Sequence, residues 1–121
     1  MDRFADMPDP PYYAVIFANQ LSDRPAGYEA MADTLAELAT TMPGYLGVES
    51  TRDGDGFGIT VSYWRDEAAI RGWKARTEHL TGQKMGMEQW YAHYRLRVAK
   101  IERHYTGPQG RDDPSLAFKG G

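Results

Sequence analysis

The chain has 121 residues, which suits one domain with its own core and leaves too little for two. Its 14 Lys and Arg residues are interspersed with 17 Asp and Glu residues, so no basic stripe predicts nucleic-acid binding. No apolar run approaches the ~20 residues of a membrane helix, and the N-terminus lacks a segment of signal-peptide type. We therefore expect a cytoplasmic protein without a membrane partner. The absence of Cys excludes disulfides, thiolate nucleophiles and zinc–thiolate sites.

The N-terminal third predicts an extended lead-in, a strand and a helix. Prolines restrict residues 1–11 to extended conformations. Residues 12–18 are aromatic or β-branched with few breaks, which predicts a strand buried on both faces that ends near Asn19. Residues 22–25 then resemble a helix entry, and apolar side chains recur at steps of three and four until Pro43 stops the helix.

The middle of the chain predicts a β-hairpin that continues directly into a second helix. The turn is Asp53-Gly54-Asp55-Gly56, whose residues tolerate positive φ, and apolar residues alternate with polar or small ones on both sides of it. After Trp64 the period changes from two to about three and a half, with Asp66 as the N-cap. The Asp-Gly run lacks the later acidic ligand of a calcium loop, so we interpret it as a turn.

The C-terminal third predicts short helices, a strand and a tail. Gly82 and Gly86 interrupt a polar stretch, and residues 88–91 predict one further helical turn. Residues 94–101 alternate, which predicts a half-buried strand with charges on one face. From residue 106 the composition is that of a flexible tail. The predicted organisation is a lead-in at 1–11, a domain at 12–105 and a tail at 106–121.

The order strand, helix, strand, strand, helix, strand predicts an α+β fold. It is the ferredoxin-like βαββαβ arrangement, a four-stranded antiparallel sheet with both helices on one face. The other face would expose aromatic and aliphatic side chains to water unless a second copy covered it. Burial alone therefore predicts a homodimer.

Five segments of the chain carry a recognisable pattern: Met42-Pro43-Gly44-Tyr45-Leu46-Gly47-Val48-Glu49-Ser50, Gly58-Ile59-Thr60-Val61-Ser62-Tyr63-Trp64, Glu67-Ala68-Ala69-Ile70, Trp73-Lys74 and Glu78-His79-Leu80. Together they resemble the antibiotic biosynthesis monooxygenase superfamily. The resemblance covers about residues 12–105 and implies a dimeric α/β barrel. The family includes cofactor-free monooxygenases of aromatic polyketides or quinols, haem-degrading enzymes, and many members of no known activity.

The resemblance implies roles for three residues, each of which also has a structural interpretation. Trp73 and Asn19 stand where haem-degrading relatives carry a substrate-contacting tryptophan and an active-site asparagine. Trp73 is equally expected as a core aromatic, and Asn19 as a strand-end residue. His79 is the one candidate haem ligand on the second helix, but Gln83 stands where that ligand is expected. We interpret His79 as a surface or pocket-wall histidine, or as a group that helps deprotonate a substrate.

The function we predict is cofactor-independent monooxygenation of a small aromatic, phenolic or quinol-like substrate. The alternatives are a non-catalytic small-molecule-binding dimer of the same fold, and a haem-binding or haem-degrading monooxygenase. The spacing of His, Asp and Glu predicts no metal site. The predicted catalytic residues are Asn19, Trp73 and His79, in a pocket between the sheet and the second helix. The predicted substrate-binding residues are Phe17, Tyr28, Trp64, Arg76 and Tyr91.

Overall fold

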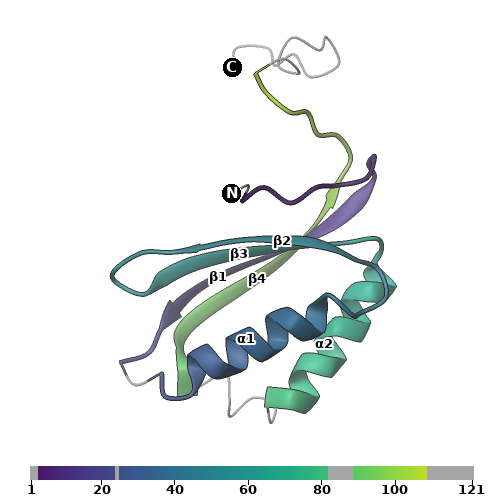
Figure 1. Ribbon diagram of the computed structural model, residues 1–121. Coiled ribbons are helices and arrows are strands. Elements are labelled where there is room, and N and C mark those ends of the chain that lie inside the picture. The colour runs from purple at the N-terminus through teal and green to yellow at the C-terminus, as the bar shows by residue number, and fades with distance from the viewer. Residues whose placement is uncertain (1–2, 24, 82–88, 109–121) are drawn as a thin grey trace.

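The computed structural model describes residues 3–23, 25–81 and 89–108. Its elements are, in order, β1 (Tyr12–Leu21), α1 (Tyr28–Ala39), β2 (Tyr45–Arg52), β3 (Phe57–Trp64), α2 (Glu67–Thr81) and β4 (Tyr91–Ile101). The strands form one antiparallel sheet in the order β2-β3-β1-β4, with both helices on the same face (Figure 1). The α+β ferredoxin-like fold predicted from the sequence is confirmed.

The element boundaries differ from the prediction where tertiary pairing decides them. Strand β1 continues past Asn19 to Leu21, because β3 and β4 pair with it on both sides. Helix α1 begins only at Tyr28, since Gly27 before it adopts a left-handed conformation with φ +80°. It ends at Ala39, well before Pro43.

The predicted helical turn at residues 88–91 overlaps the observed strand β4 at Tyr91. Gln89 and Trp90 are helical, but Tyr91 pairs with Leu21 and begins β4, so the predicted turn at 88–91 is too long. The predicted short helices around Gly82 and Gly86, and most of the predicted tail, lie outside the described residues.

The predicted hairpin and the second helix entry are confirmed. The Asp53 carboxylate accepts hydrogen bonds from the backbone N–H of Asp55 (2.9 Å) and Phe57 (3.0 Å), which closes the turn. The Asp66 carboxylate accepts one from Ala69 N–H at 2.8 Å, as an N-cap does. The hairpin register follows from this turn and places Arg52 opposite Gly58.

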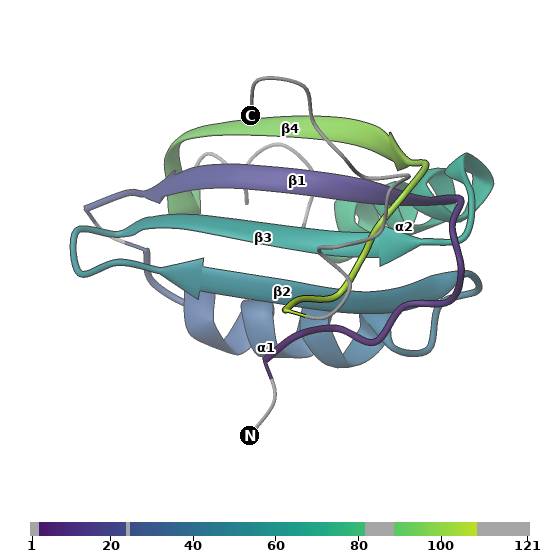
Figure 2. The same ribbon diagram turned by 90° about the horizontal axis from the view of Figure 1, so that it is seen from above.

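The face without helices is partly covered by the two ends of the chain, as seen from above in Figure 2. The Ala5 N–H donates to Glu49 Oε2 (3.0 Å), and the Tyr12 hydroxyl hydrogen-bonds His104 Nδ1 (2.6 Å). On this same face Phe57 and Ile59 are 45% and 37% exposed. We call the side of the sheet without helices the open face.

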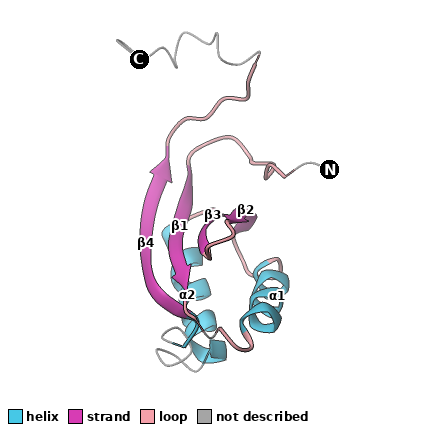
Figure 3. Cartoon of the chain, turned by 90° about the vertical axis from the view of Figure 1, so that its left-hand side faces the viewer, coloured by secondary structure: helices cyan, strands magenta, loops and turns pink. Residues whose placement is uncertain are grey.

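Strand β4 lies at the edge of the sheet (Figure 3). Its side chains are much more exposed than predicted. Leu96 and Val98 lie on the same side of the sheet as the helices but are 50% and 52% exposed. The prediction that residues 94–101 are half-buried is therefore wrong, although the predicted alternation holds. The prediction that β1 is buried on both faces also holds only in part. Tyr12, Ala14 and Asn19 are buried, and the other residues of β1 are half-buried.

Candidate functional site

The candidate site begins with a row of residues that crosses the sheet on its helical side. Arg52 of β2 pairs with Gly58 of β3, and Gly58 pairs with Asn19 of β1. A Cβ atom at position 58 would lie 2.8 Å from Arg52 Cζ, closer than such atoms approach. Glycine at this position therefore lets the guanidinium lie across β3 and reach Asn19.

The Arg52 guanidinium is held by three acceptors. Its Nη2 donates to Asn19 Oδ1 (2.8 Å) and to the Tyr28 hydroxyl (2.9 Å), and its Nη1 donates to the carbonyl of Gly56 (2.6 Å). The same group lies 5.4 Å from the centre of the Tyr28 ring, within cation–π range. Arg52 thus links β1, β2, α1 and the hairpin turn at one point.

Asn19 is the buried polar side chain of the described core, at 2% exposure. With its Oδ1 accepting from Arg52, its amide nitrogen has one long hydrogen bond, to the Phe17 carbonyl at 3.3 Å. Because Arg52 donates to the oxygen, the Nδ2 group is fixed as the donor end of the amide. A side-chain amide oriented in this way can donate to a ligand oxygen.

Aromatic rings surround this polar centre. Tyr91 meets the rings of Phe17 (5.2 Å) and Tyr28 (5.7 Å) edge-to-face, and Tyr94 lies 5.6 Å from Phe17. Burial raises the pKa of Tyr91 above its usual range, and its interactions with Tyr28 raise it further, while the Arg52 cation opposes them. The Tyr91 hydroxyl is therefore protonated at neutral pH.

The two predicted tryptophans form a separate cluster. Trp64 is fully buried and stacks on Trp73 at 5.8 Å, and Tyr45 meets Trp64 edge-to-face. Trp64 pairs with Tyr13, six residues along β1 from Asn19, or about 20 Å of strand. The stack lies at the far end of the sheet from Asn19.

The polar residues predicted on α2 are both exposed. Arg76 lines a hollow of about 360 Å³ between the two helices, together with Leu38, Leu80 and three other residues of α1 and the turn after it. His79 lies on the last turns of α2. The structure therefore groups Asn19 with Phe17, Tyr28 and Tyr91, and does not bring Trp64, Trp73, Arg76 and His79 into contact with them.

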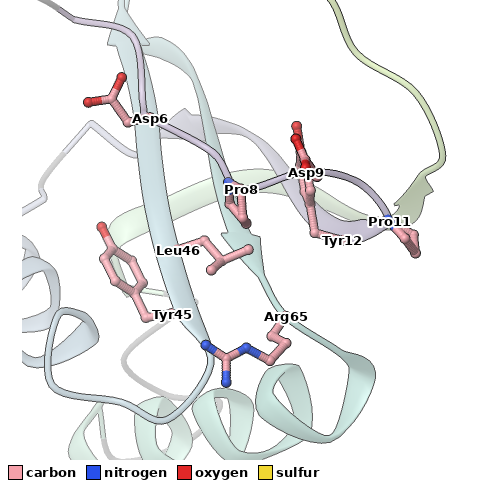
Figure 4. Close-up of a pocket in the computed structure, with 8 residues that line it drawn as sticks. All are labelled: Asp6, Pro8, Asp9, Pro11, Tyr12, Tyr45, Leu46 and Arg65. Atoms are coloured by element: carbon pink, nitrogen blue, oxygen red, sulfur yellow. The ribbon is translucent and has the colours of Figure 1, made fainter.

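A second hollow, of about 390 Å³, lies beneath the N-terminal segment, and Figure 4 shows its lining. Asp6 and Asp9 of that segment line the hollow from one side. Arg65, the residue directly after β3, lines it from the side of the sheet. None of the predicted site residues lines this hollow. Its lining residues are Asp6, Pro8, Asp9, Pro11, Tyr12, Tyr45, Leu46 and Arg65.

Next to this hollow, the open face carries its own polar group. The Tyr63 hydroxyl donates to Glu49 Oε1 at 2.6 Å, and Tyr12 meets the Tyr63 ring edge-to-face. Burial, followed by the hydrogen bond to Glu49, raises the pKa of Tyr63 above its usual range. Burial and the Glu49 charge also raise the pKa of Tyr12.

The described residues offer neither a metal-binding cluster nor a membrane-spanning helix. Residues 3–23, 25–81 and 89–108 hold no group of three or more His, Asp or Glu side chains placed to bind a metal ion. Within the same ranges, no helix has the length and apolar character that crossing a membrane requires.

Comparison with known proteins identifies the family. The sequence model of the antibiotic biosynthesis monooxygenase (ABM) family matches residues 11–85. The chain is also 44% identical to the uncharacterized protein YqjZ of Bacillus subtilis over 113 residues, which cover 93% of this chain and 99% of YqjZ. The protein therefore belongs to the antibiotic biosynthesis monooxygenase family.

Solved structures share the fold at low sequence identity. One is a mutant form of SnoaB of Streptomyces nogalater, a cofactor-independent oxygenase. It has a TM-score of 0.64 and 15% identity, and the match covers 77% of this chain and 95% of SnoaB. Another is protein SO0527 of Shewanella oneidensis, with a TM-score of 0.64 and 11% identity over 79% of this chain and 97% of that one.

Sequence reasoning missed Arg52 and Gly58, the two residues that define the centre of the site. The signal that could have found them is the alternation of side chains along the strands. Val48, Ser50 and Arg52 alternate onto one face of β2, so a charged residue ends a row that faces the helices. Such a cation needs an acceptor, and the glycine opposite it leaves the space to reach one.

Proposed function

We propose that this protein is a cofactor-independent monooxygenase that acts on a small aromatic, phenolic or quinol-like substrate at Asn19. The observation that carries the proposal is the buried Asn19 amide, whose orientation Arg52 fixes among aromatic rings. Membership of the ABM family and the shared fold with the cofactor-independent oxygenase SnoaB support it.

The chemistry requires a substrate that supplies all the electrons. When a phenol with a free ring C–H is converted to a quinone, it loses two hydrogens and gains one oxygen atom. The second oxygen atom of dioxygen leaves as water with those two hydrogens. The substrate gives up four electrons, so the protein needs only to favour the deprotonated substrate, position it and exclude water.

The residues around Asn19 match those tasks. The Asn19 amide would donate to the oxyanion of the substrate or of its peroxide adduct. Phe17, Tyr28 and Tyr91 would hold an aromatic ring through edge and face contacts. Tyr91 and Tyr28 have hydroxyls within the same network and could relay the substrate proton. Trp64, Trp73, Arg76 and His79 remain proposed site residues, at a greater distance from this centre.

Oxygen uptake with a panel of naphthols, anthrones and hydroquinones tests the proposal. We expect consumption of one dioxygen per quinone formed, and incorporation of one labelled atom from ¹⁸O₂. Asn19→Ala should lower kcat about 100-fold, the usual effect of removing one such donor. Ser50→Ala is the matched control, because Ser50 lies on the same sheet face but bonds Thr60 instead. Equal turnover by Asn19→Ala and the wild type would refute the role of Asn19.

The two alternative functions give different results in the same preparation. A non-catalytic binding protein would be stabilised by members of the panel without oxygen uptake. A haem-binding protein would show a saturable Soret shift with haemin that His79→Ala abolishes. We expect no such His79-dependent shift, because His79 is exposed on α2 and lies outside the Asn19 network.

We also propose that the protein is a homodimer formed through the open face. Phe57 and Ile59 are the most exposed apolar side chains there, at 45% and 37%. Light scattering on a size-exclusion column should give twice the mass of one chain. Ile59→Glu should give the mass of one chain, and a wild-type monomer at micromolar concentration would refute the proposal.

A further inference from the structure

Arg52 carries a positive charge that the surrounding residues do not balance. Its neighbours are Asn19 on β1, Tyr28 on α1 and the Gly56 carbonyl in the hairpin turn, all neutral groups. Tyr91 on β4 adds a hydroxyl that is protonated at neutral pH. Among the described residues, no carboxylate lies within ion-pair distance of this guanidinium.

An unbalanced cation that is half-buried favours a negative partner. Removing a charge from water is costly unless an opposite charge or several hydrogen bonds compensate for it. Here three neutral acceptors hold the guanidinium in one orientation, and donors on Nη1 and Nε are left without an acceptor among the residues that the structure describes. A ligand oxyanion would meet preformed, charge-assisted donors.

The aromatic rings beside Arg52 restrict the form of such a ligand. Phe17, Tyr91 and Tyr94 form a cluster of edge-to-face and tilted rings next to Asn19, suited to a flat ring rather than to a small inorganic anion. The ligand would place its ring against this cluster and its charged oxygen toward Arg52 and the Asn19 amide.

We propose that Arg52 makes the site selective for aromatic oxyanions, so that a phenolate binds in preference to the corresponding neutral phenol. Arg52 is then a specificity-determining residue, and Gly58 is the residue that gives it room. The inference rests on the proposed function only in placing the ligand at Asn19.

The test uses 4-nitrophenol, whose phenolate absorbs visible light. Its pKa in the bound state is measured by titrating the full-length protein into the probe over a pH series. We expect the phenolate to bind at least about tenfold more tightly than the phenol, which is a fall of one unit or more in the pKa of the bound probe. Arg52→Met should remove this preference and Arg52→Lys should keep part of it. Arg71→Met, an exposed position on α2, should match the wild type.

A bound-probe pKa that is unchanged or raised would overturn the inference, as would an Arg52→Met variant with the same preference or the absence of saturable binding. If Arg52→Met does not fold, 4-nitroanisole decides, because it keeps the ring but cannot ionise. The wild type should bind it at least about tenfold more weakly than the phenolate, and equal binding would overturn the inference.

The outcome is separable from that of the proposed function. Asn19-dependent oxygen uptake without a phenolate preference would leave the oxygenase standing and remove the role of Arg52. An Arg52-dependent phenolate preference without oxygen uptake would support the role of Arg52 and remove the oxygenase.

Discussion

Replacing Gly58 by Ala tests whether the space above β3 holds the site together. The new Cβ would lie 2.8 Å from Arg52 Cζ, 2.9 Å from Nη1 and 3.1 Å from Nη2, so the guanidinium must move. The hydrogen bonds to Asn19 and Tyr28, at 2.8 and 2.9 Å, would then be strained or lost.

The magnitude follows from what the movement leaves behind. A hydrogen bond to a charged group contributes ~1.5–3 kcal/mol, and a buried acceptor left without a donor costs ~1–3 kcal/mol. Arg52 is half-buried and can recover water contacts, whereas Asn19 at 2% exposure cannot. We therefore expect Gly58→Ala to lower the free energy of unfolding by about 1–3 kcal/mol.

The assay is urea unfolding of four proteins that form a double-mutant cycle: the wild type, Gly58→Ala, Arg52→Met and the double variant. If Gly58→Ala acts through Arg52, its cost should fall by at least about 1 kcal/mol in the Arg52→Met background. Gly54→Ala is the control, since a Cβ there meets no atom within 4 Å. Costs that add to within ~0.5 kcal/mol would refute the reasoning, because they would show that the two positions do not interact.

Three further predictions concern other parts of the fold. Gly72→Ala on an exposed face of α2 should raise the free energy of unfolding by up to ~1 kcal/mol, since a Cβ there meets nothing; an unchanged urea midpoint would contradict this. The pKa of Tyr63 is higher in the folded chain than in the unfolded chain, so the folded chain holds this proton more tightly. The stability that results is complete below pH ~10 and is lost as the pH rises further. The urea midpoint of the wild type should therefore fall more than that of Tyr63→Phe between pH ~8 and pH ~11, and parallel curves would contradict the assignment. Trp73→Ala should cost roughly 2–4 kcal/mol in urea unfolding, because it removes the ring stacked on the fully buried Trp64; a cost below ~1 kcal/mol would show that the stack is not structural.

Local chemistry was enough to predict the elements of this fold. The Asp53 turn and the Asp66 cap act through hydrogen bonds between near neighbours in sequence, so both were visible without the structure. The change of period after Trp64 located α2 for the same reason. Boundaries set by partners far along the chain were missed, as at Leu21, which pairs with Tyr91.

The candidate site was predicted only in part. Asn19, Phe17, Tyr28 and Tyr91 were named from their residue types and from the family resemblance, and the structure brings these four together. Trp73 and His79 were named in the same way, but lie apart from them. Resemblance supplies residue identities along the chain, whereas distance between side chains depends on how the strands pair.

What the sequence determined by itself was the order of elements, the fold class and the family, since each depends on patterns within short segments. Only the tertiary structure decided that the row Arg52, Gly58, Asn19 crosses three strands and places a cation beside a buried amide. The physical reason is register. A shift of one residue in either strand pairing would turn Arg52 or Asn19 to the opposite face of the sheet, and register is fixed by long-range packing together with the turn.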